Sequence, residues 1–262
     1  MGYERQEAAQ MVADAGAQVR ALAALQLRGI DECQGLPRPV QHHLTHGFGR
    51  RVGMMQRALF GIFAVFPPTQ QTPLKPERLQ EAQSHLHVFT INLAGLFDNL
   101  AWAFVLRHNL LDRIGDPRRV GMFKAATRRF FTPTLRSYLT TDPIAAWQRD
   151  YLTTYRDALA HRIPPYIPPA HMTDDEAARL EALSAQELEC VRSQDWGRLE
   201  QVRQEQSQLG EPCFVFMHEF SSDREARPVL LHPQLITDCA TVAECGDRFF
   251  STWHEPAAGS DQ

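Results

Sequence analysis

The chain has 262 residues, a formal net charge of −4 and 44% hydrophobic residues, which is typical of a folded globular protein and excludes a fully disordered one. Its five cysteines contain no Cys-x-x-Cys spacing, so we expect reduced thiols, with neither a disulfide framework nor a cysteine zinc site. The N-terminus shows no apolar signal-peptide core, and the longest apolar stretch, Leu86 to Leu106, is interrupted by polar side chains. We therefore expect a cytoplasmic protein without a membrane span.

The charges are divided unevenly along the chain. Residues 1–172 carry 20 Lys and Arg against 13 Asp and Glu, whereas residues 173–262 carry 7 against 18. A basic body can attract a polyanion, and the Arg-Arg-Phe-Phe run at residues 128–131 places cations beside rings that can stack on bases. The other interpretation is a solvated arginine-rich face whose two phenylalanines belong to the core.

Apolar residues at helical spacing predict a mainly α-helical bundle. In chain order, we expect helices over residues 3–28, from after Pro39 to Phe66, over 76–108, over 120–131 and over 143–162, with an extended or irregular stretch at 132–141. The segment 76–108 is apolar on nearly all sides around its middle, so we expect it to be the central helix.

The last third of the chain is more acidic and contains the only strand pattern. Thr173 to Glu176 and Ser184 to Glu187 both match a capping box, which predicts charged helix up to about Leu209. Residues 213–220 and 229–231 predict a small β-hairpin, and a final helix follows from Pro233. The expected organisation is a basic helical bundle at 1–172, an acidic helix and β-hairpin insertion at 173–231, a C-terminal helix that returns to the bundle at 232–254, and a disordered tail at 255–262.

The strongest chemical signal is the segment Tyr155 to Arg162, which closes a predicted helix before the proline-rich run Ile163 to Pro169. Arg156 is followed by polar Asp157 and, five positions on, by His161. Arginine presents a fixed fork of donors to phosphate oxygens, and histidine exchanges a proton near neutrality. Other Arg/His pairs also have four to six residues between them, but their arginines precede proline or an apolar residue: Arg38/His43, Arg78/His85, Arg227/His232 and Arg248/His254.

This arrangement resembles the R-x(4–6)-H motif of the HEPN superfamily, small helical bundles that include metal-independent endoribonucleases and non-catalytic RNA-binding or dimerisation modules. In catalytic members, arginine and histidine from two protomers meet at a dimer interface, and a 2′-hydroxyl attacks the adjacent phosphate.

The resemblance implies that Arg156 binds the scissile phosphate, that His161 assists proton transfer and that Asp157 orients the pair. It further implies RNA as partner, a homodimer, and no cofactor or metal. The chain is longer than a minimal family bundle. The predicted RNA-contacting arginines are Arg128, Arg129 and Arg162.

Two polar residues, Asp98 and Asn99, lie inside the most apolar predicted helix, where each must find a partner. Arg156 is one candidate partner for Asp98. Asp98 and Asn99, together with Tyr155, would then hold the motif residues in position without contacting the RNA themselves. The other interpretation is a hydrogen-bond network that only fixes the register of the helices.

The sequence leaves three classes of function open. The first is the RNA-binding protein, with or without ribonuclease activity. The second is a non-catalytic interaction or scaffold protein in which Arg156, Asp157 and His161 are structural and the acidic insertion contacts a protein partner. The third is a small-ligand or metal-binding bundle. His42, His43 and His46 have a spacing that can share a metal ion, but no acidic residue accompanies them, so we predict no metal site.

Overall fold

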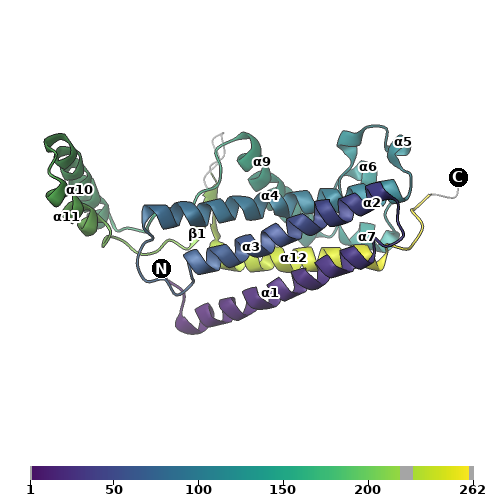
Figure 1. Ribbon diagram of the computed structural model, residues 1–262, viewed down its shortest axis with the longest axis horizontal. Helices are drawn as coiled ribbons and strands as arrows, with labels where there is room; N and C mark the ends of the chain where they lie inside the picture. Colours follow the sequence, from purple (N-terminus) through teal and green to yellow (C-terminus); the bar gives the residue numbers. More distant parts are fainter. Residues whose placement is uncertain (1, 219–226, 260–262) are drawn as a thin grey trace.

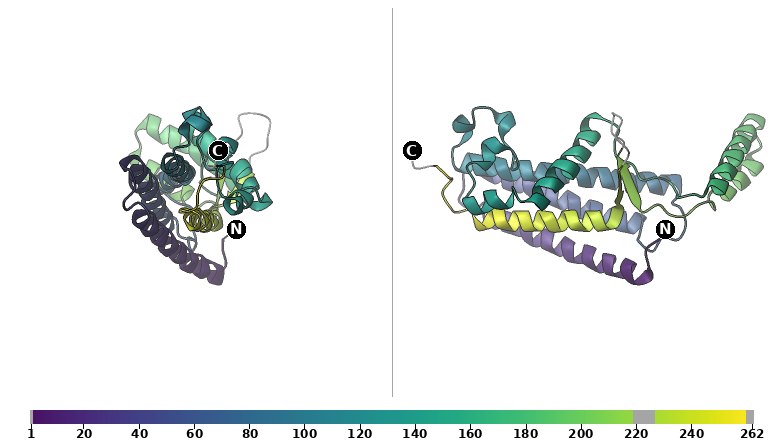
Figure 2. Two further views of the ribbon diagram at one scale, coloured as in Figure 1. Left: turned by 90° about the vertical axis from the view of Figure 1, so that its right-hand side faces the viewer. Right: turned by 180° about the vertical axis from the view of Figure 1, so that it is seen from behind.

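Four long helices form the body of the protein in the computed structural model, which describes residues 2–218 and 227–259. They are α1 (Arg5–Asp31), α3 (Arg50–Val65), α4 (Pro76–Arg107) and α12 (Leu231–Ser251). α3 runs antiparallel to α1 and α4, and α12 lies along α1 (Figure 1). Figure 2 shows the same bundle from its end and from behind. The predicted mainly α-helical bundle is confirmed.

α4 is the central helix, as the sequence predicts. Pro76 occupies its first turn, where a missing N–H costs nothing, and Glu77 suits the positive end of the helix. Beside α3, it contacts α2 (Arg38–His42), the π-helix η1 (His43–Gly49), the π-helix η3 (Trp147–Leu152) and α9 (Thr153–His161). Among the described residues α4 is also the one helix long and apolar enough to span a membrane, and 56% of its most apolar window is buried inside the fold.

Short helices cap one end of the bundle, and here two predictions were wrong. They are α5 (Leu111–Ile114), the 3-10 helix η2 (Pro117–Arg119), α6 (Ala125–Arg128), α7 (Pro133–Tyr138) and α8 (Asp142–Ala146). The helix predicted at 120–131 shrinks to α6, and the stretch predicted as irregular at 132–141 contains α7. The reason for α7 is local: the Thr132 hydroxyl accepts the Leu135 N–H, and Pro133 starts the helix.

The acidic segment divides into two parts that lie in different places. α10 (Asp174–Ser193) and α11 (Trp196–Gln206) pair with each other around a small cluster of their own and project from the bundle (Figure 1). Thr173 forms the predicted capping box with Glu176, but the second predicted box was wrong. Ser184 lies inside α10, where its hydroxyl bonds to the Leu180 carbonyl.

The β-hairpin, in contrast, belongs to the bundle. β1 (Val215–His218) pairs antiparallel with β2 (Arg227–Leu230), and Phe214 and Phe216 are buried in the main core. The predicted strand residues 219–220 lie outside the described residues. At the C-terminal end, Ala257 is buried and the Ala258 N–H donates to the Phe130 carbonyl, so this part of the expected disordered tail packs on the fold.

A buried carboxylate joins η3 to α12. Asp238 is fully buried and accepts hydrogen bonds from Trp147 Nε1 at 2.9 Å, the Tyr151 hydroxyl at 2.7 Å and Gln234 Nε2 at 2.9 Å. All three donors are neutral, so burial dominates and raises the pKa of Asp238 to about 6. The network anchors the π-helical segment that leads into α9.

This network predicts a specific pH dependence. Because the pKa of Asp238 is higher in the folded state than its ordinary 3.8, the folded protein binds more protons between about pH 4 and 6, and the free energy of unfolding falls as pH rises through that window. Asp238→Asn removes this loss. In denaturant titrations, the free energy of unfolding of the variant minus that of the parent should rise by roughly 2 to 3 kcal/mol from pH 4 to pH 7.

A second buried group, His232, makes the free energy of unfolding depend on pH in the opposite direction. It is present in both proteins, so it does not affect the difference between them. Burial lowers the pKa of His232 to about 4, so its contribution to stability rises with pH in both proteins. Stability curves that stay parallel from pH 4 to pH 7 would contradict a protonated Asp238 in the folded state.

Candidate functional site

The Arg/His motif lies on α9, which packs on α4. The helix ends at His161, as predicted, and Arg162 has extended backbone angles (φ −138°, ψ −160°). The proline-rich chain that follows is tied to α4: His87 Nε2 donates to the Pro165 carbonyl at 2.7 Å, and the Ile167 N–H donates to Gln83 Oε1 at 2.9 Å. These two bonds hold the end of α9 in place beside the central helix.

The motif residues face solvent. Arg156 Nη1 lies 3.1 Å from Asp157 Oδ1, and the two side chains are 43% and 37% exposed. His161 is exposed as well. Asp157 and His161 are four residues apart and share one face of α9, whereas Arg156 and His161 lie about 140° apart around it. Asp157 therefore stands between the two basic side chains. Tyr155 is instead buried against Phe216, with ring centroids 5.3 Å apart, and anchors α9 to the hairpin.

A cluster of charges surrounds Asp98 on α4. Asp98 is exposed on one side, but the neighbouring protein atoms partly remove water from its carboxyl and raise its pKa, and the positive charges of Lys124, Arg156 and Arg51 oppose the rise. The carboxylate packs closely on the loop before α6, because Asp98 Oδ1 lies 3.1 Å from the position that a Cβ would take at Gly121. The direct ion pair of Arg156 is with Asp157, so the expected Asp98–Arg156 pairing takes the form of a longer-range attraction.

Asn99 belongs to a hydrogen-bond network between helices, which was one of the two interpretations of the sequence, but its partners Arg51 and His43 were not predicted. Its Oδ1 accepts from Arg51 Nε at 2.9 Å, and its Nδ2 lies 3.4 Å from His43 Nδ1. Arg51 Nη1 also donates to Asn92 Oδ1 at 3.3 Å. His43 stacks on Trp102, with ring planes 9° apart. The network connects η1, α3 and α4 on the polar side of the central helix.

One sequence signal for this network was available. Asn92, Gly95 and Asn99 recur at spacings of three and four and share a face of α4. The guanidinium of Arg51 occupies the space over Gly95, where an added Cβ would overlap it. A glycine between two asparagines in an otherwise apolar helix thus marks the place where a large polar side chain crosses it.

The other predicted RNA contacts are scattered. Arg128 donates to the Phe123 carbonyl at 3.4 Å, Arg129 lies at the capped end of the bundle, and Arg162 is exposed beside the motif. Phe130 and Phe131 are buried, which confirms their assignment to the core and excludes them as stacking platforms for bases. The cationic surface is therefore discontinuous.

The side chains of His42, His43 and His46 do not point to a common position. The rings of His42 and His46 contact each other with centroids 4.9 Å apart, while His43 turns towards α4. Within residues 2–218 and 227–259, no group of three or more His, Cys, Asp or Glu side chains has the arrangement of a metal site.

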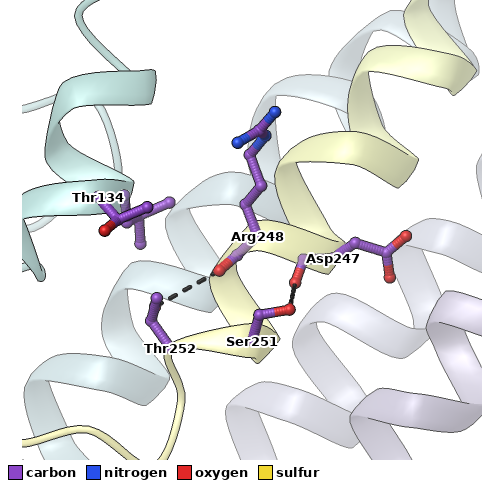
Figure 3. Close-up of a pocket in the computed structure, with 6 residues that line it drawn as sticks. Thr134, Asp247, Arg248, Ser251 and Thr252 are labelled. Atoms are coloured by element: carbon purple, nitrogen blue, oxygen red, sulfur yellow. Dashed lines mark hydrogen bonds between the residues drawn. The ribbon is translucent and has the colours of Figure 1, made fainter.

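A shallow depression of about 270 Å³ lies where α7 meets α12 (Figure 3). Its polar groups are engaged locally: the Ser251 hydroxyl donates to the Asp247 carbonyl at 2.7 Å, and Arg248 Nη2 pairs with Glu244 at 2.9 Å. This depression offers few free donors to a ligand. Comparison of the chain with protein-family models, with curated proteins and with solved structures gives no match.

Proposed function

We propose that this protein binds RNA through the surface formed by α9 and the polar side of α4. The observation that carries the proposal is the excess of positive charge there: Arg51, Lys124 and Arg156 act on the Asp98 carboxylate, and Arg156 also pairs with Asp157. A phosphate group would compete with Asp157 for the half-exposed Arg156 guanidinium, because both present oxygens to the same fork of donors. The exposure of Arg156 and His161 leaves both side chains accessible to a ligand.

We further propose that two copies of the chain place their motifs across a shared groove and cleave RNA. One base removes the proton of the 2′-hydroxyl, and the oxygen attacks the adjacent phosphorus. The bond from phosphorus to the 5′-oxygen breaks, an acid protonates that oxygen, and a 2′,3′-cyclic phosphate remains. His161 is the group suited to proton transfer, and Arg156 balances the charge that develops on the phosphoryl oxygens. Because α9 sets these residues about 140° apart, a second protomer would supply the missing partner on each side.

The projecting α10–α11 pair favours a second candidate function as a protein-binding module. Leu188, Val191 and Trp196 are large apolar side chains exposed on this pair, Trp196 to 62%. Exposed apolar groups on an acidic arm are typical of protein contacts. In this alternative, the bundle serves as a scaffold and the motif surface is not catalytic.

A combined experiment tests the proposed function. The purified parent protein is incubated with end-labelled single-stranded RNA in EDTA, and its mass is followed by sedimentation at tens of micromolar, roughly the range in which modest affinities become visible. We expect a dimer and fragments that end in 2′,3′-cyclic phosphate. A strict monomer that leaves the RNA intact would refute the ribonuclease, and an absence of RNA binding in the same samples would refute the RNA-binding proposal as a whole.

A further inference from the structure

Three arginines line an open pocket of about 570 Å³ at the capped end of the bundle. Arg113 from α5, Arg129 next to α6 and Arg136 from α7 share this pocket with Phe130, Ala258 and Gly259. All three arginines are exposed, whereas Phe130 is 3% exposed and forms the apolar floor. α5, α6 and α7 lie near the end of the bundle, and α9 lies nearer its middle (Figure 1). The pocket is thus separate from the Arg/His motif.

Two of the guanidinium groups are held in place. Those of Arg113 and Arg129 lie over the Phe130 ring, 4.8 and 4.6 Å from its centroid. Arg129 Nη2 also donates to the Arg113 carbonyl at 2.7 Å, near the end of α5. A cation held over an aromatic face loses less side-chain freedom when it binds an anion, so its contribution to affinity is larger.

The described residues that line this pocket carry three positive charges and no negative charge. In the part of the chain that the structure describes, no carboxylate lies within ion-pair distance of Arg113, Arg129 or Arg136. The exposed arginines of α10 and α11 show a different pattern, with Arg198 and Arg203 each bonded to a glutamate. Three positive charges around one cavity repel one another, and a bound anion would relieve this repulsion.

We propose that Arg113, Arg129 and Arg136 form a binding site for a phosphate group. One guanidinium fork matches the oxygens of either phosphate or carboxylate, but three forks around one pocket match a doubly charged group with several oxygens better than a singly charged carboxylate or halide. Phe130 supplies an apolar surface beside the anion. The phosphate could be the 5′ end of an RNA strand or part of a free nucleotide, since both present the same chemistry. The site does not depend on the proposed function of the Arg/His motif.

The test compares probes that differ by one phosphate. A fluorescent RNA decamer with a 5′-phosphate is compared with its 5′-hydroxyl form by anisotropy, and AMP is compared with adenosine by calorimetry. In low salt we expect the phosphorylated member of at least one pair to bind about tenfold tighter, as one good charge-assisted contact allows. A preference within the RNA pair identifies a strand end as the source, and one within the nucleotide pair identifies a free nucleotide. Equal affinities within both pairs would overturn the proposal.

Variants assign the preference to this pocket. Arg113→Gln and Arg136→Gln should each reduce it about fivefold or more, and Arg129→Lys should weaken it although the charge is kept, because the fork is lost. Arg118→Gln is the matched control: it removes one exposed charge from the same end of the bundle but does not line the pocket. A similar loss in Arg118→Gln would show only a general charge effect and would contradict the site. His161→Ala should leave the preference unchanged, which separates this result from the fate of the proposed ribonuclease.

Discussion

Replacement of Arg156 or His161 by alanine is expected to lower RNA cleavage by at least about 100-fold, the usual loss when a proton-transfer group or an electrostatic stabiliser is removed from a reaction. The free energy of unfolding should change by less than about 1 kcal/mol, because a half-exposed ion pair contributes little to stability. The measurements are initial rates on end-labelled RNA in EDTA and denaturant unfolding of the same preparations.

The chain contains a matched control for this prediction. Arg149 pairs with Asp150 at 2.8 Å, one residue along the chain, in the same way as Arg156 pairs with Asp157, and its side chain is 68% exposed. Arg149→Ala should leave both the cleavage rate and the stability nearly unchanged. If Arg156→Ala instead costs several kcal/mol and Asp98→Asn restores part of it, then Arg156 neutralises the Asp98 carboxylate and the motif is structural. That outcome would favour the scaffold function.

The largest loss of stability is expected for Leu100→Lys on the central helix. Leu100 is 0% exposed in the main core, so the substitution removes apolar packing and places an ammonium group among apolar side chains. The two effects together should cost at least about 4 kcal/mol, enough to unfold much of the protein if its total stability is ordinary. Circular dichroism during urea titration would measure the loss.

A lysine substitution at an exposed position of the same helix provides the comparison. Ile91 is 39% exposed on α4, so Ile91→Lys keeps its charge in water and should cost less than about 1 kcal/mol. Leu100→Ala should fall between the two, at about 2 to 4 kcal/mol, since it leaves a cavity but no buried charge. Equal losses for Ile91→Lys and Leu100→Lys would contradict the central position of this face of α4.

Local sequence patterns were sufficient to predict most of the helical elements. The proline at position 76 and the long apolar segment after it specify α4, and the threonine at 173 with its glutamate specifies the start of α10. The patterns failed where several weak signals compete within a few residues. α7 depends on a single hydroxyl cap, which apolar periodicity does not reveal. The helix predicted at 143–162 is present, but the π-helical form of its part η3, which the Asp238 network joins to α12, was not predicted.

The sequence by itself determined the mainly α-helical class, the basic and acidic halves, and the residue types and spacing of the Arg/His motif, because these depend on composition and on contacts between near neighbours. Only the tertiary structure decided which charges meet. It placed Arg51 and Lys124 around Asp98, paired Arg156 with Asp157, and brought Arg113, Arg129 and Arg136 to one pocket. Arg156 and Asp157 are neighbours in the chain, but the charges around Asp98 and those of the pocket come from several different helices and loops. Their proximity follows from how the core packs, and no local pattern encodes it.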